Sequence, residues 1–127
     1  MERFGFGWLR LAAVLLWLSI PAFAHHGVAA YEAGTKTALE GTVTNFEWEN
    51  PHALIYFDVT DDAGSAQKWT AETAGLVLLV RAGWNKNSLK PGERCKIVGS
   101  RAKNGSNTMI LRYLVLPSGK ELSNYVP

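Results

Sequence analysis

Short alternating segments separated by turn residues are the feature that most restricts the fold of this chain. The clearest is HALIYFDV at 52–59, in which every second residue is apolar. This alternation is typical of a β-strand with one face in a core. A change in the apolar phase near Asn45 predicts a bulge or bend within the first strand. The five predicted strands occupy residues 37–48, 52–59, 67–72, 93–100 and 108–116.

One segment breaks the alternation. Residues 74–82 (AGLVLLVRA) are continuously apolar up to Arg81, and Gly83 follows. We interpret this segment as a short buried helix that ends at the glycine, although its composition leaves a strand open. Three strands, a helix and two strands is the order of the OB-fold. The sequence therefore predicts an all-β domain with one short helix, a five-stranded OB-fold-like small barrel; a small barrel of another topology is the alternative.

The first 24 residues have the three parts of a secretory signal peptide. Arg3 and Arg10 give a basic start, residues 11–20 are apolar except for one serine, and AFA at 22–24 is a small-x-small cleavage signal. A membrane span needs about 20 apolar residues, so an uncleaved anchor is the less favoured alternative. We expect a signal peptide at 1–24, an N-terminal arm at 25–36 and a barrel domain at 37–127.

Composition narrows the function. The chain has 13 Lys and Arg against 11 Asp and Glu, which gives no basic footprint for nucleic acid. Its one cysteine, Cys95, excludes an internal disulfide and a cysteine-rich zinc module, and we predict that it is buried. No Gly-x-Ser-x-Gly or phosphate loop is present, so we do not expect an enzyme. We expect a periplasmic or secreted protein without a membrane span after processing, whose partner is a metal ion, a small ligand or a periplasmic protein.

The three histidines, His25, His26 and His52, suggest a metal site. Cleavage after residue 24 would let His25 chelate through its free α-amine and its ring, and the other two imidazoles could complete the set. A nitrogen-rich set favours copper, and zinc is the second choice if an acidic residue joins. The alternative is weak metal binding at a His-His terminus, with His52 hydrogen bonded in the turn.

A second group of residues predicts a ligand-binding face. If the second and third strands form a hairpin, His52 and Glu72 project from the same face. Such a face would hold an oligosaccharide, a peptide or a partner protein, as OB-folds do. Acid–base chemistry is the least favoured interpretation, and the carboxylates on the rim could simply be solvated. The candidate ligand-binding residues are Glu47, Glu49, Tyr56 and Glu72.

Several motifs run across the segment that follows the predicted signal. They are AHH at 24–26, GTV at 41–43, ENPH at 49–52, WTAE at 69–72, RAGW at 81–84, LKPG at 89–92 and NGS at 104–106. In these motifs the chain resembles a group of small secreted bacterial proteins classed as a domain of unknown function. It differs at Gly27, where the group usually has serine, and at Tyr31-Glu32, where an aromatic residue is often followed by aspartate. The resemblance implies an exported bacterial protein and gives no activity; its motif positions include His25, His26, His52 and Glu72.

Overall fold

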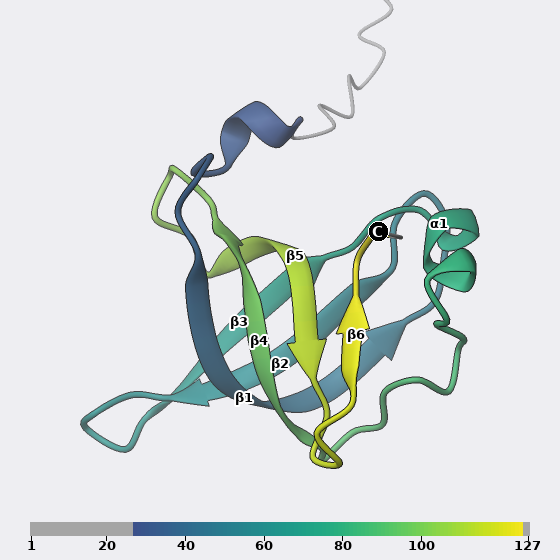
Figure 1. Ribbon diagram of the computed structural model, residues 1–127. Coiled ribbons are helices and arrows are strands. Elements are labelled where there is room, and N and C mark those ends of the chain that lie inside the picture. The colour runs from purple at the N-terminus through teal and green to yellow at the C-terminus, as the bar shows by residue number, and fades with distance from the viewer. Residues whose placement is uncertain (1–26, 126–127) are drawn as a thin grey trace, which may run out of the picture.

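Six strands and one short α-helix make up residues 27–125, the part of the chain that the computed structural model describes (Figure 1). The predicted signal peptide, His25 and His26 lie outside these residues. The helix α1 (Leu76–Arg81) lies between β3 and β4, and a 3-10 turn spans Val28–Ala30. The strands are β1 (Thr37–Glu47), β2 (Leu54–Thr60), β3 (Ala66–Glu72), β4 (Arg94–Arg101), β5 (Thr108–Val115) and β6 (Glu121–Ser123).

The strands form a closed barrel. The sheet runs in the order β3-β2-β1-β4-β5-β6, and an additional pairing of β3 with β5 closes the circuit of the first five strands. That closing pair is parallel, whereas the other pairs are antiparallel. Five strands in this circuit, with a helix between the third and the fourth, confirm the predicted small barrel. The short β6, which no sequence pattern predicted, pairs with the second half of β5.

Two irregularities decide which side chains face the core. The register of β1 against β2 shifts between Val43 and Asn45, as the change in apolar phase predicted. A second shift, in the pairing of β4 with β5, was not predicted. Strict alternation from Met109 would place Tyr113 inside the barrel, but the shift buries Leu114 instead. The outer surface of β5 therefore carries Tyr113, which is half-buried.

The barrel interior is apolar and closely filled. Phe57 is fully buried, and its ring stacks on that of Trp69 with a centroid distance of 6.3 Å. Trp84 is buried, and its indole Nε1 donates a hydrogen bond of 2.7 Å to the Ser123 carbonyl. Cys95 is buried as predicted, and burial raises the pKa of its thiol to about 11. At neutral pH the thiol is therefore protonated, which suits a packing role and not a nucleophilic one.

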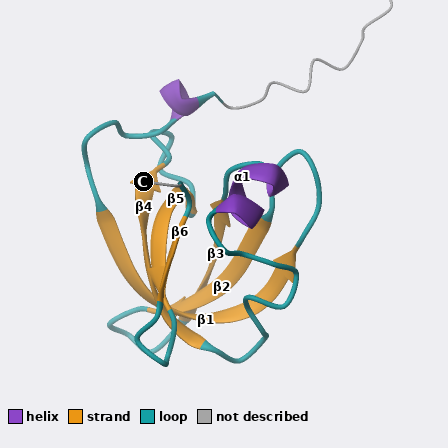
Figure 2. Cartoon of the chain, turned by 45° about the vertical axis from the view of Figure 1, so that its right-hand side comes forward, coloured by secondary structure: helices purple, strands orange, loops and turns teal. Residues whose placement is uncertain are grey.

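The helix α1 lies at one end of the barrel beside the C-terminal segment (Figure 2). Gly83 follows it at a φ of +91°, the left-handed conformation expected where a helix ends. The prediction that this segment is buried was wrong, because Leu79 is buried but Val77 is 67% exposed and Val80 59% exposed. A helix of six residues can turn only one side toward the barrel, so the rest of its apolar run faces solvent. No helix within residues 27–125 is long and apolar enough to cross a membrane.

The described part of the N-terminal arm is docked on the barrel. Tyr31 is only 6% exposed and forms a β-bridge with Ala102, just beyond β4. Two backbone hydrogen bonds flank it, from the Lys103 amide to the Ala30 carbonyl (2.9 Å) and from the Glu32 amide to the Arg101 carbonyl (2.8 Å). The start of the described chain is thereby fixed relative to the outer surface of the barrel.

Candidate functional site

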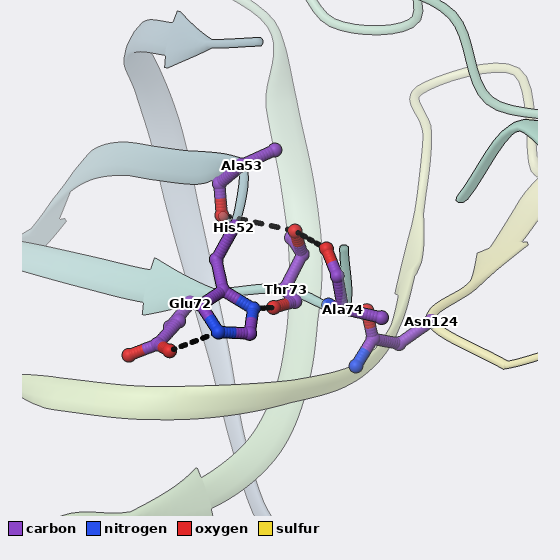
Figure 3. A network of polar contacts seen from close by, with 6 residues as sticks. All are labelled: His52, Ala53, Glu72, Thr73, Ala74 and Asn124. Atoms are coloured by element: carbon purple, nitrogen blue, oxygen red, sulfur yellow. Dashed lines mark hydrogen bonds and ion pairs between the residues drawn. The ribbon is translucent and has the colours of Figure 1, made fainter. Parts of the chain in front are cut away.

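His52 lies two residues before β2 begins, after a cis peptide bond between Asn50 and Pro51. Its ring Nδ1 lies 2.9 Å from the backbone carbonyl oxygen of Thr73 (Figure 3). A carbonyl oxygen only accepts hydrogen bonds, so Nδ1 carries the hydrogen in this contact. In the neutral ring Nε2 therefore holds the lone pair, and this is the nitrogen that a metal ion or a proton would take.

Glu72, at the end of β3, faces that second nitrogen. Its Oε1 lies 3.6 Å from His52 Nε2, and Figure 3 shows the two side chains pointing toward one another. The antiparallel pairing of Leu54 with Glu72 sets this juxtaposition, as the predicted hairpin requires. The side chains of His52 and Glu72 are 37% and 30% exposed, so a solute can reach the pair.

The peptide segment that orients the histidine is itself held by buried polar contacts. The Thr73 hydroxyl lies 2.9 Å from the carbonyl oxygens of both Ala53 and Ala74 and can donate to either. Asn124, which is 1% exposed, accepts a hydrogen bond of 2.6 Å from the Ala74 amide and donates one of 2.8 Å to the Leu111 carbonyl. Because these groups are satisfied inside the protein, the Thr73 carbonyl has a fixed direction. Asn124 was not identified from the sequence. Its sequence context shows only a polar residue after the last predicted strand.

Tyr31 connects the arm to the same carboxylate. Its phenol lies near the Glu72 carboxylate and Thr108, and both influence its ionisation. Burial, and after it the negative charge of Glu72, raises the pKa of the Tyr31 phenol. The phenol therefore stays protonated at neutral pH beside a carboxylate that has lone pairs for a further partner. Sequence reasoning treated Tyr31 only as a motif position; an isolated aromatic residue in a polar arm was the available signal.

A pocket of about 300 Å³ brings these groups together. His52 and Glu72 line it, and so do Gly27 and Val28, the first described residues of the arm. Gly27 directly follows His26 in the sequence. Between residues 27 and 125, no group of three histidine, cysteine or acidic side chains could hold a metal ion. The described chain thus contributes two candidate ligands, and the pocket borders the point where the predicted histidine pair joins the arm.

The other predicted ligand-binding residues lie elsewhere. The Tyr56 hydroxyl donates a hydrogen bond of 3.2 Å to Glu47 Oε2, and both residues line a separate pocket of about 540 Å³ on the outer face of β1, β2 and β3. Burial and the Glu47 carboxylate raise the pKa of the Tyr56 phenol. Glu49 is exposed beyond the end of β1. The four candidates therefore do not form one site, because Glu72 joins His52 and Glu47 joins Tyr56.

The geometry of the histidine–carboxylate pair fits a metal ion. With metal–ligand bonds of roughly 2.1 Å, two ligands at a tetrahedral angle lie roughly 3.4 Å apart. The separation of 3.6 Å between Nε2 and Oε1 is close to that value and long for a hydrogen bond. Donation from the other ring nitrogen to a backbone carbonyl is the usual support of a metal-binding histidine. The pair alone is an incomplete ligand set, so a metal ion bound here would need further ligands.

Comparison with known proteins places the chain in a family without an assigned activity. No curated protein and no solved structure matches it. The motifs noted above had already suggested a family of unknown function, and a family model now supports that assignment. The model of the family of unknown function DUF6152 matches residues 13–111, and the chain belongs to this family.

Proposed function

We propose that this chain is an exported periplasmic protein that binds a transition metal through His25, His26 and His52, with Glu72 as an additional ligand. Copper is the preferred metal and zinc the second choice. The role is metal handling or sensing and not catalysis. The observation that carries the proposal is the orientation of His52, whose Nδ1 donates to the Thr73 carbonyl while Nε2 faces Glu72 in a pocket that Gly27 also lines.

The position of the arm supports the involvement of the terminal histidines. Tyr31 is buried against the barrel, and Gly27 lies at the pocket that contains His52 and Glu72. Cleavage after residue 24 would leave His25 and His26 as the two residues before Gly27. A peptide residue spans at most about 3.6 Å, so two residues keep any ligands they carry near this pocket.

The ligand chemistry favours copper. An α-amine with imidazole nitrogens forms a nitrogen-rich set, and copper has the highest affinity in the divalent series. The Glu72 carboxylate makes zinc the natural competitor, because zinc accepts oxygen beside nitrogen in a tetrahedral set. Both metals need deprotonated ligands, so acid weakens binding of either.

Copper titration of the correctly processed protein tests the proposal. The protein is expressed with its own signal, its N-terminus is verified by mass spectrometry, and a second form carries one extra alanine before His25. We expect tight one-to-one Cu(II) binding that weakens sharply in the extended form and in His52→Gln. Glu49→Gln is the matched control for Glu72→Gln, because Glu49 is an exposed acid beyond the strand end. Equal, weak binding by all forms would contradict the proposal.

A binding module on the outer face of β1, β2 and β3 is the second candidate function. The pocket of about 540 Å³ that contains Tyr56 and Glu47 favours it, together with the fold, because OB-folds bind oligosaccharides on this face. Its ligand would be an oligosaccharide, a peptide or a partner protein. Under this function Tyr56→Ala abolishes binding to an oligosaccharide array, and changes at the N-terminus have no effect. The reverse result would exclude it.

A further inference from the structure

A groove beside the arm adjoins the pocket that contains His52 and Glu72, with which it shares Val28, Ile110 and Tyr125. It has a volume of about 460 Å³ and lies between the arm and the outer surface of β5 and β6. Arg112 of β5 and Lys36 of the arm bring two positive charges to it, and Glu32 brings one negative charge. Its tyrosine walls are Tyr31, Tyr113 and Tyr125. A volume of this size is within the usual range for small-ligand pockets, roughly 300–1,000 Å³.

The arginine in this groove lacks an acidic partner. Arg112 is half-buried, and the one ion pair among residues 27–125 joins His52 to Glu72. Glu32 lines the same groove, but it makes no ion pair with Arg112 or Lys36. A partly desolvated guanidinium without a counter-ion is unfavourable, and its planar fork of donors matches a carboxylate. A negatively charged group beside Arg112 would therefore be electrostatically favourable in this groove.

The side chains that line the groove indicate the chemical nature of the rest of a negatively charged ligand. Ile110 and the tyrosine rings give the groove a mainly apolar surface. Aromatic rings bury flat or aliphatic groups well and keep their hydroxyls for hydrogen bonds. We propose that this groove binds a small organic carboxylate with an aromatic or aliphatic body, with Arg112 holding the carboxylate in two parallel hydrogen bonds and Lys36 adding charge at the entrance.

Nuclear magnetic resonance titration of the metal-free protein tests the groove with benzoate as the probe. Benzamide is the uncharged control, because it has the same ring and nearly the same shape. We expect benzoate, and not benzamide, to shift the backbone amide signals of Ser100, Ile110 and Ser123, which line the groove. Loss of a charge-assisted pair should weaken benzoate binding about tenfold or more in Arg112→Gln. Arg94→Gln, an exposed change at the start of β4, should leave binding unchanged.

Equal shifts with benzoate and benzamide, or unchanged benzoate binding in Arg112→Gln, would overturn the proposal. If Arg112→Gln does not fold, Lys36→Gln decides, because this exposed residue can be changed without disturbing the core. A weakening of about twofold to fivefold in Lys36→Gln supports the proposal, and no change contradicts it. No metal is present in this titration, so its outcome is separate from that of the copper experiment.

Discussion

Two polar pairs that connect β2 or its start to a neighbouring strand differ in how they are supported. His52 with Glu72 and Tyr56 with Glu47 each join a ring to a carboxylate across neighbouring strands. The first pair has a neighbour on both sides, since the Thr73 carbonyl orients the imidazole and the Tyr31 phenol lies near the carboxylate. In the second pair the Tyr56 hydroxyl donates a hydrogen bond directly to the Glu47 carboxylate. The difference shows that the surrounding contacts, more than the residue types, single out a candidate site.

The comparison also concerns the distance between the two members of each pair. In the first pair, one imidazole nitrogen and at least one carboxylate oxygen face each other at 3.6 Å, a separation that a metal ion can bridge. In the second pair, the Tyr56 hydroxyl and the Glu47 carboxylate already satisfy one another at 3.2 Å. A ligand at the second pair would have to compete with that hydrogen bond or use its remaining lone pairs.

The largest expected effect separates the pairs by copper affinity. His52→Gln should weaken Cu(II) binding by about 100-fold or more, because a metal ligand is removed. Glu47→Gln should leave the affinity unchanged, because Glu47 lies in the other pocket. Isothermal titration calorimetry of both variants measures the contrast. Similar losses of copper affinity in both variants would contradict the assignment of the metal site to the first pair.

Removing Asn124 tests whether its contacts support the first pair alone. Asn124→Ala leaves the Ala74 amide and the Leu111 carbonyl without their side-chain partner. We expect a loss of about 2–3 kcal/mol in the free energy of unfolding, measured by urea denaturation. Asn45→Ala, at the exposed bulge of β1, is the control and should have a small effect. Copper affinity should fall in Asn124→Ala, because the Thr73 carbonyl loses its anchored neighbour.

Tyr31→Phe keeps the buried ring and removes the hydroxyl that contacts Glu72. We expect a loss of about tenfold in copper affinity and about 1 kcal/mol in stability. The fold raises the Tyr31 pKa above 10.0, so its contribution is complete below pH 10 and disappears as the pH rises through the folded-state pKa. Denaturation between pH 9 and pH 12 should therefore show a smaller alkaline loss of stability in Tyr31→Phe. Identical alkaline profiles would contradict the contact with Glu72.

The smallest effect is expected at the second pair. Tyr56→Phe removes its hydrogen bond to Glu47, which is partly exposed to solvent. We expect a change of about 0.5 kcal/mol or less in the free energy of unfolding and none in copper affinity. A destabilisation as large as that of Tyr31→Phe would show that the two pairs are supported equally.

The order of elements could be predicted because it depends on local pattern. Alternation along residues 52–59 identified β2, and the change in phase near Asn45 located the bulge in β1. The contact between His52 and Glu72 followed from pairing β2 with β3. These features arise within one strand or one hairpin, so the residues that determine them are close in the sequence.

The features that could not be predicted depend on residues far apart in the sequence. Tyr31 docks beside Ala102 and Glu72, and no local pattern in the arm indicates such partners. The exposure of α1 follows from its position at the barrel end, and the position of Tyr113 follows from a register shift against β4. The apolar content of these segments indicates burial in general and does not say which side is covered.

The barrel closes through its shortest seam, and the candidate site lies on that seam. β3 and β5 pair over three residues, from Thr70 with Thr108 to Glu72 with Ile110, whereas β2 and β3 pair over seven. Local opening of a barrel is expected first where the pairing between two strands is short and parallel. Tyr31 lies near one residue of each strand, Glu72 of β3 and Thr108 of β5, so the docked arm connects the two strands. An ion bound at Glu72 would stabilise the pairing of β3 with β5. Metal binding should therefore slow amide hydrogen exchange along β3 and β5, far more than in β1.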